Sequence, residues 1–255
     1  TGKLFTTLTE GYTGWYANGN SKTYAIDNIS IRAESIVGRT NVEVTEPFWF
    51  RDEFGVNDSG RWYGYPSGFV WDTANNELDV YGGTSDATAV VTPTLKNPTM
   101  SFDWNVVEGG GYARIIVVIS GQTIPTSAAT NPYYIPDCYY ILFDGGNARI
   151  TLSKGAAGGA TVVEELTGIV LAPYYNTTIT IEKTDTEINV KSGETTIATF
   201  TAAGVASIPA GKMGFSNKIS MTCTSASIKN LQISGTRVYN KPIHRGAMLE
   251  TYHDG

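Results

Sequence analysis

Short runs in which apolar and polar residues alternate recur from residue 48 to residue 234, and turn signals rich in Gly, Asn and Pro separate them. Alternation places successive side chains on opposite faces of a strand, and turn signals roughly every 8–12 residues are typical of β-sandwiches. No long window repeats with the helical period of about 3.6 residues. The pattern therefore predicts an all-β chain that folds as an antiparallel two-sheet sandwich.

The predicted strands share an alternating or continuous apolar pattern that ends at a turn signal. They are residues 77–81, 88–92, 99–107, 113–120, 138–143, 148–153, 177–183, 187–191, 195–201, 211–216 and 225–234. Residues 115–119 are apolar throughout, which predicts a central strand buried on both faces. The Asp-Gly-Gly-Asn sequence at 144–147 predicts a hairpin, whereas residues 124–136, with three prolines, predict a long irregular loop.

The rest of the chain is organised around residues 48–80, which read as an opening strand, a long polar and aromatic loop, and a strand pair turned at Asn75 and Asn76. We expect residues 46–236 to form the sandwich. Residues 1–45 are expected to be a strand segment and linker, with the end of a preceding module as the alternative. Residues 237–255 are expected to be a tail without a strand pattern that orders on a partner. The sequence begins without an initiator Met or a signal peptide, so we expect it to come from a longer or processed chain.

The composition of the chain limits the kinds of partner that we expect it to bind. Hydrophobic residues make up 41% of the chain and charged residues 16%, which is enough apolar material for a sizeable core. The net charge is −6 and no basic stripe is present, so we expect no nucleic-acid partner. No apolar run is long enough to span a bilayer, so we expect no membrane partner. Cys138 and Cys223 are too few for a disulfide framework, and either a single bridge or two separate thiols fits the sequence.

Two parts of the sequence resemble known protein families. Residues 25–32 (AIDNISIR) are similar to the closing strand of carbohydrate-binding-type jelly-roll modules in bacteriophage tail and fibre proteins. The span 52–233 resembles the concanavalin A-like, laminin-G-like jelly roll through its opening, its central meander and its closing strand pair. These features are residues 51–54 with 60–62, residues 179–193, and residues 211–215 with 226–233. The resemblance implies a jelly-roll sandwich, a fold that glycosidases, lectins, adhesion modules and virion decorations share.

Glu77 and Asp79 form the one carboxylate pair that we weigh as catalytic, because residues i and i+2 of a strand share a face. The pair resembles the Glu-x-Asp motif of retaining glucanases on this fold, in which a further Glu acts as acid/base and the two carboxyls lie about 5–5.5 Å apart. Tyr81 or Gly82 stands at the acid/base position here. The alternative is a plain strand in which Leu78 faces the core and both carboxylates are solvated, and we expect no catalytic residues.

Other site chemistry has little support. Asp52, Glu53, Asn57, Asp58 and Asp144 supply oxygen ligands of the kind that Ca²⁺ takes, but at no spacing that defines a site, and ordinary loop polarity accounts for them. We therefore expect no cofactor and no metal, with a structural Ca²⁺ as the alternative. The two histidines, at 244 and 253, lie in the tail, so the sandwich carries neither a Ser-His-Asp nor a zinc pattern.

Aromatic residues are the remaining candidates, because an exposed ring can stack on a sugar while its polar end and its neighbours bind hydroxyls. The predicted carbohydrate-binding residues are Trp62, Tyr63, Tyr65, Trp71, Tyr133 and Tyr134. The alternative is that the tryptophans pack in the core or at its edge. Tyr139 and Tyr140 are adjacent in one predicted strand, so only one of the two can face the core.

We expect a non-enzymatic structural or adhesion module of a virion (tail, fibre or capsid decoration) or of a cell surface, able to bind glycans. Its expected location is a virion or extracellular, and its expected partners are neighbouring virion or surface subunits, polysaccharide and further copies of itself in a homo-oligomer. Two alternatives stay open: a free-standing lectin-like module, and a glycoside hydrolase with a degenerate Glu-x-Asp motif.

Overall fold

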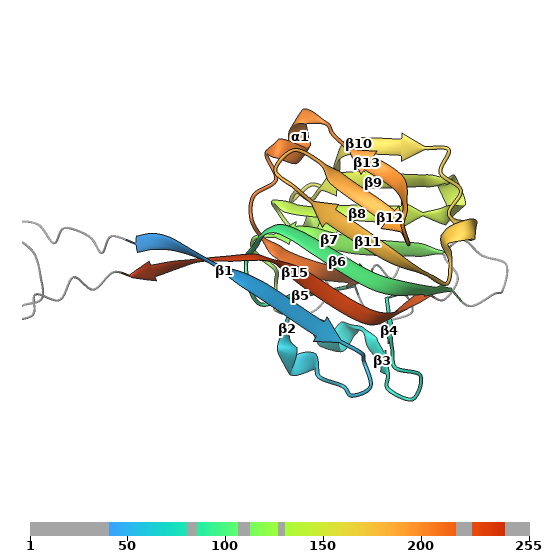
Figure 1. Ribbon diagram of the computed structural model, residues 1–255, viewed down its shortest axis with the longest axis horizontal. Helices are drawn as coiled ribbons and strands as arrows, with labels where there is room; N and C mark the ends of the chain where they lie inside the picture. The colour runs from blue at the N-terminus through green and yellow to red at the C-terminus, as the bar shows by residue number, and fades with distance from the viewer. Residues whose placement is uncertain (1–40, 81–85, 107–112, 127–130, 218–225, 243–255) are drawn as a thin grey trace, which may run out of the picture. The chain divides into compact units, whose positions relative to one another are not determined.

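The computed structural model describes residues 41–80, 86–106, 113–126, 131–217 and 226–242 (Figure 1). The chain divides into two compact units, one of residues Thr45–Tyr239 and one of Thr1–Val44 with Asn240–Gly255. The first of these holds both sheets. Of the second, the described residues are 41–44 and 240–242, which belong to strands β1 (Asn41–Asp52) and β15 (Ala226–Pro242). The phage-like strand at 25–32 and most of the expected tail lie outside the described residues.

The larger sheet has eight strands, and its central path runs β13-β12-β11-β6-β15-β4-β3, with β1 also pairing with β15. Its strands are β1 (Asn41–Asp52), β3 (Val70–Asp72), β4 (Glu77–Asp79), β6 (Leu95–Val106), β11 (Thr177–Lys183), β12 (Ile188–Ser192), β13 (Thr195–Phe200) and β15 (Ala226–Pro242). Every pairing with a described register is antiparallel. The β3–β4 hairpin joins the sheet through only two residue pairs with β15.

The smaller sheet has seven strands in the order β10-β9-β8-β7-β14-β5-β2. They are β2 (Trp62–Gly64), β5 (Ala87–Val91), β7 (Arg114–Gly121), β8 (Cys138–Asp144), β9 (Arg149–Lys154), β10 (Thr161–Thr167) and β14 (Lys212–Asn217). Short helices fill some connections: Ser59–Arg61, Pro66–Gly68, Pro132–Tyr134, Gly145–Asn147, Ala172–Tyr174 and α1 (Ala203–Ala206). No helix of the described residues is both long and apolar enough to cross a membrane.

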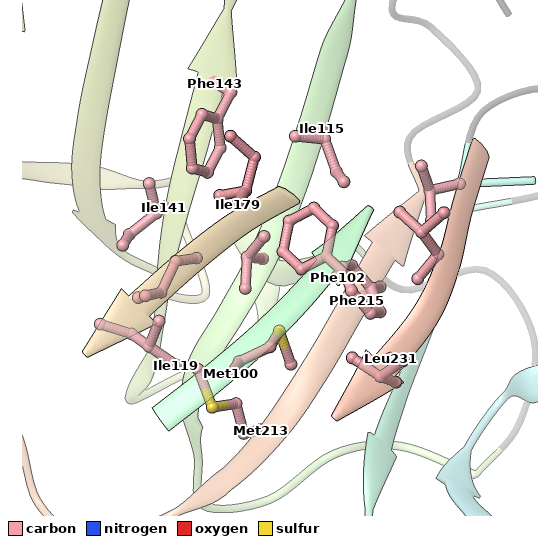
Figure 2. Close-up of a cluster of buried hydrophobic side chains, with 14 of the residues drawn as sticks. Met100, Phe102, Ile115, Ile119, Ile141, Phe143, Ile179, Met213, Phe215 and Leu231 are labelled. Carbon is pink, nitrogen blue, oxygen red and sulfur yellow. The ribbon is translucent and has the colours of Figure 1, made fainter. Parts of the chain in front are cut away.

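The main core lies between the two sheets. Alternate residues of each strand turn inward, so that Phe102 of β6 meets Phe215 of β14 edge to face at 5.2 Å between ring centroids. Figure 2 shows part of this core. Its labelled side chains are Met100, Phe102, Ile115, Ile119, Ile141, Phe143, Ile179, Met213, Phe215 and Leu231. The predicted antiparallel sandwich is confirmed, and the continuous apolar run at 115–119 is the buried central strand β7.

Strands β10 and β15 are among the segments that differ from the expected pattern. Strand β10 was not predicted, because Val162 and Val163 break the alternation where its register with β9 shifts. Strand β15 continues to Pro242 instead of ending near residue 234, so residues 237–242 are strand and not tail. Tyr139 packs in the core between the sheets while Tyr140 lies on the opposite face of β8, as expected for neighbours in a strand.

Candidate functional site

The outer face of the seven-stranded sheet, which points away from the main core, carries a second apolar cluster. Val90 of β5, Val118 of β7 and Cys138 of β8 pack there against Ile124 and Ile135. Both isoleucines belong to the stretch between β7 and β8, whose described parts, residues 122–126 and 131–137, we call the covering segment. The stretch predicted as an irregular loop is therefore bound to the sheet by buried apolar side chains.

Small residues in the sheet make room for this segment. A Cβ on Gly155, just after β9, would overlap the carbonyl oxygens of Pro132 and Ile135. A Cβ on Gly121, at the end of β7, would collide with the side chain of Ile124. Main-chain bonds hold the segment at the same place, because Ala156 N donates to Tyr133 O at 3.2 Å. The close approach of the segment therefore depends on glycine at these positions.

The buried side chain of Asn131 fixes the start of the helical turn Pro132–Tyr134 through its hydrogen bonds. The Nδ2 atom of Asn131 donates to Oδ2 of Asp86 at 2.6 Å, and its Oδ1 atom accepts from the Tyr133 main-chain N at 3.1 Å. The ring of Tyr133 lies 5.2 Å from that of Tyr140 on the outer face of the sheet. The residues on both sides of Tyr134, Tyr133 and Ile135, are thus anchored on the sheet.

Tyr134, between these two anchors, is 53% exposed. It lines a hollow of about 330 Å³ together with polar and apolar residues of the covering segment, namely Gln122, Thr123, Pro125, Ile135, Pro136 and Asp137. Asp137 forms an ion pair with Lys154 at 2.7 Å at the edge of this hollow. An exposed aromatic ring on a rigid support, with hydroxyl, amide and carboxylate groups beside it, is a surface that can bind a sugar ring and its hydroxyls.

The two predicted tryptophans are part of the core instead. Trp62 is 6% exposed, and its Nε1 donates to Oδ2 of buried Asp52 at 3.1 Å. Trp71 is half-buried against the core, where its Nε1 donates to the carbonyl of Pro66 at 3.2 Å. The ring of Trp62 is buried and offers no face to a sugar, while Trp71 is partly buried and the polar end of its indole is bonded to the main chain. Both tryptophans pack in the core or at its edge, which is the alternative that the sequence left open.

The other predicted tyrosines lie at intermediate depth. Tyr65 packs against the main core, and Tyr63 packs against the outer-face cluster with the Lys212 ammonium 5.0 Å from its ring centroid. Tyr133 packs on Tyr140, as described above, and burial raises its pKa. Of the six predicted aromatic residues, Tyr134 alone is exposed. The sequence analysis did not single out Gln122, Thr123 or Asp137 as site residues. The sequence features that could have drawn attention to them are the neighbouring prolines, Pro125 and Pro136.

Glu77 and Asp79 lie on the outer face of the eight-stranded sheet, while Leu78 between them is buried in the core. Glu77 accepts from Lys229 Nζ at 2.7 Å, from Asn105 Nδ2 at 2.9 Å and from Ser227 Oγ at 2.6 Å. The expectation that both carboxylates are simply solvated is therefore wrong for Glu77, which is held in a hydrogen-bonded cluster.

The pKa values of the two carboxylates move apart. Burial raises the pKa of Glu77, but its bonds from Lys229 and Ser227 outweigh this and hold the pKa below its ordinary value. Burial, followed by the negative charges of Glu77 and Asp72, raises the pKa of Asp79 to about 6. Two carboxylates, one with a raised pKa and one with a lowered pKa, can serve acid/base chemistry, but the same pKa shifts arise in a cluster that is only structural.

The residues considered for Ca²⁺ have other partners where the structure describes them. Asp52 accepts from Trp62 and from the Phe54 main chain, Glu53 pairs with Arg51, and Asp144 pairs with Arg114. Within the described ranges, no group of three or more His, Cys, Asp or Glu side chains is arranged to hold a metal ion. Cys138 is a free buried thiol whose pKa is raised by burial to about 12, and Cys223 and both histidines lie outside the described residues.

Comparison with known proteins identifies the fold. No protein-family model matches the sequence, and no curated protein matches it. A Bacillus subtilis protein of unknown function with a galectin-like fold is similar, with 12% identity over 74% of this chain and 96% of that chain, at a TM-score of 0.52. The metal-free exoplasmic/lumenal domain of VIP36 shares 10% identity over 75% and 95% of the chains, at a TM-score of 0.50.

A lectin from Bauhinia forficata in complex with GalNAc is also similar, with 11% identity over 75% of this chain and 98% of that chain, at a TM-score of 0.48. At these identities the likeness shows the fold alone. The chain therefore has a two-sheet sandwich similar to that of the galectin-like protein and of the VIP36 domain, in agreement with the fold that the sequence resemblance implied, and its site has to be argued from its own residues.

Proposed function

We propose that this protein is a non-enzymatic glycan-binding module and that the hollow around Tyr134 is its saccharide site. The observation that carries the proposal is the exposed ring of Tyr134 between two anchored neighbours. An anchored platform loses little conformational freedom when a ligand binds, which favours affinity. The side chains of Gln122, Thr123 and Asp137 supply donors and acceptors for hydroxyl groups beside the ring.

Two observations favour binding over hydrolysis. Glu77 is held by three donors on the outer face of the eight-stranded sheet, and Tyr81 or Gly82 stands where the related glucanase motif carries its acid/base. The hollow around Tyr134 lies instead on the outer face of the seven-stranded sheet, and Asp137 is the one carboxylate among the residues that line it. Hydrolysis with two flanking carboxylates needs a second one beside the same bond.

The setting that we propose for this module is a virion or a cell surface, with neighbouring subunits or further copies of the chain as protein partners. The support is the phage-like sequence at residues 25–32 and the low charged fraction of 16%. A free-standing lectin-like module would show the same saccharide binding without the protein partners. Deletion of residues 1–40 separates the two, because a self-contained lectin keeps both its binding and its oligomeric state after the deletion.

Affinity electrophoresis through gels cast with different polysaccharides tests the function directly, with released reducing ends assayed in the same lanes. We expect at least one polysaccharide to retard the wild type without release, and Tyr134→Ala to abolish the retardation. Trp49→Ala is the matched control, because Trp49 is also an exposed aromatic residue, at 62%, but lies on β1 away from the hollow. Release of reducing ends, or equal retardation of Tyr134→Ala and wild type, contradicts the proposal.

A further inference from the structure

A second group of polar side chains lies on the same outer face, toward the other end of β8. The register pairs Arg114 of β7 with Asp144 of β8, and Asp144 with Arg149 of β9. Glu165 of the neighbouring strand β10 accepts from Arg149 Nη1 at 2.7 Å. We call Arg114, Asp144, Asn147, Arg149 and Glu165 the arginine network. Because cross-strand partners share a face of the sheet, Arg114, Asp144 and Arg149 lie in one row. The ion pair extends this row to Glu165 on β10, and Asn147 lies in the turn between β8 and β9.

Asp144 is the buried member of this row, and both arginines bond to it. Its side chain is 2% exposed and accepts from Arg114 Nε at 2.8 Å, from Arg149 Nη2 at 3.5 Å and from Asn147 Nδ2 at 2.6 Å. Burial raises its pKa, but the bonds from Asn147 and Arg114 outweigh this and keep the pKa below its ordinary value. The buried carboxylate is therefore ionised at neutral pH and fixes the two guanidinium groups on the surface of the sheet.

The charges of the network indicate the kind of ligand. Two arginines and two carboxylates balance, so the row has no net charge to attract an ion. Arg114, Arg149 and Glu165 are partly exposed, at 22%, 34% and 34%, and they alternate donors with an acceptor along the surface. A saccharide hydroxyl donates one hydrogen bond and accepts others, so a row of fixed donors and acceptors suits the hydroxyls of a neutral sugar.

The network and the hollow are connected through adjacent residues of the covering segment. The ring of Tyr133 rests on Tyr140 in a small apolar cluster that also holds Leu142, and Asp144 is the next residue of β8 on the same face. Tyr134, the residue after Tyr133, lines the hollow. Cys138, beneath Ile135, and Asp144 mark the two ends of β8, which at roughly 3.4 Å per residue are about 20 Å apart. A single sugar ring cannot reach from one to the other.

From this arrangement we infer that the arginine network is a second saccharide subsite, which binds the hydroxyls of a neutral polysaccharide held at the same time on Tyr134. The inference rests on the proposed function and adds that the ligand is a polymer recognised along its length, not a terminal sugar. Two linked contacts on one rigid face raise the affinity for a chain that reaches both, and leave the affinity for a short fragment unchanged.

The test compares fragment length in wild type and variants by isothermal titration calorimetry. The probes are neutral cello-, xylo-, manno- and malto-oligosaccharides, each as disaccharide and as hexasaccharide. We expect the hexasaccharide of one series to bind about tenfold more tightly than its disaccharide, which is the effect of one or two added hydrogen bonds. Arg149→Gln and Glu165→Gln should lose this gain and keep the disaccharide affinity, whereas Tyr134→Ala should lose both.

Glu165→Gln keeps the test informative if Arg149→Gln unfolds, because Glu165 is partly exposed and its replacement leaves both bonds from arginine to Asp144 in place. Arg51→Gln is the control, since Arg51 is an exposed arginine on β1. Equal affinity of the wild type for disaccharide and hexasaccharide overturns the inference. Folded Arg149→Gln and Glu165→Gln proteins that still bind the hexasaccharide about tenfold more tightly than the disaccharide overturn it as well. In both cases binding at Tyr134 still stands. Binding of no saccharide in either the gel or the calorimeter overturns the proposed function as well.

Discussion

The Nδ2 atom of Asn131 lies 2.6 Å from Oδ2 of Asp86, so a buried amide ties the start of the Pro132–Tyr134 turn to the beginning of strand β5. Asn131 is 1% exposed, and its Oδ1 atom also accepts from the Tyr133 main chain. One side chain thus joins two parts of the chain that are 45 residues apart and sets the path of the segment that carries Tyr134. The position of the proposed sugar platform depends on this contact.

Replacing this amide should weaken both the fold and the site. We expect Asn131→Ala to lower the free energy of unfolding by about 1–3 kcal/mol, because it removes two partly buried hydrogen bonds of a buried amide. Polysaccharide affinity should fall as well, since Tyr134 loses part of its support. Urea unfolding and affinity electrophoresis measure the two effects, with the exposed Asn57→Ala as control. Unchanged affinity in a folded Asn131→Ala protein would show that the turn does not need this bond.

A methyl group at Gly155 should displace the covering segment. Gly155→Ala places a Cβ against the main-chain oxygens of Pro132 and Ile135, and neither can move without the segment. We expect a loss of about 1–3 kcal/mol of stability and a weaker affinity for polysaccharide. Gly158→Ala is the matched control, because nothing lies within 4 Å of a Cβ at that position. Thermal unfolding of both variants checks this, and equal melting temperatures would refute the close packing of the covering segment on Gly155.

The indole of Trp62 should matter for stability and not for binding. Trp62→Phe keeps an aromatic ring in the core but leaves the buried Oδ2 of Asp52 without its donor at 3.1 Å. We expect a cost of about 1–3 kcal/mol in chemical unfolding. Retardation in polysaccharide gels should remain at the wild-type level under conditions where the variant is folded. A selective loss of retardation would return Trp62 to the list of binding residues.

Asp79 should make the protein less stable above neutral pH than at mildly acidic pH. Its pKa of about 6 in the folded state lies above the ordinary value of 3.8, so the folded state binds the proton more tightly. The folded state therefore gains stability as pH falls from above 6 toward 4. Because the group is only half buried, we expect Asp79→Asn to stabilise the protein by about 1–2 kcal/mol at pH 8, after allowance for solvent screening.

Glu77 provides the contrast, because its pKa is lowered in the folded state. Its contribution is present above its ordinary pKa of 4.5 and is lost as the pH falls through the lower folded value. Glu77→Gln should thus destabilise the protein at pH 8, where Asp79→Asn stabilises it. Melting temperatures of wild type and both variants between pH 4 and pH 8 check this pair, and the same sign for both variants at pH 8 would contradict it.

The sandwich could be predicted because its strands are short, alternating and separated by turn signals, as in 177–183, where the predicted and observed strands coincide. Strand β10 could not, because a register shift between Val162 and Glu164 disrupts the two-residue period on which the prediction depends. The end of β15 was missed for a related reason, since residues 235–242 show little alternation and the strand is held there by its pairing partners.

The candidate site was only partly predictable. The sequence analysis proposed Tyr134 as an exposed ring. It also placed Tyr139 and Tyr140 on opposite faces of one strand, a prediction that depends only on local strand geometry. The sequence could not show that Trp62 is buried while Tyr134 is exposed. This difference depends on contacts between distant parts of the chain, namely the hydrogen bond from Trp62 to Asp52 and the anchoring of the covering segment. The arginine network was missed for the same reason, because Arg114, Asp144 and Arg149 meet only once the strands pair.

The central claim is that saccharide binds against the exposed ring of Tyr134. Nitration with tetranitromethane, followed by peptide mass spectrometry, measures the accessibility of each tyrosine with and without a polysaccharide that retards the protein. We expect the polysaccharide to protect Tyr134 from nitration and to leave Tyr239, half-buried on β15, at its free rate. Unchanged nitration of Tyr134 in protein saturated with that polysaccharide would contradict the account.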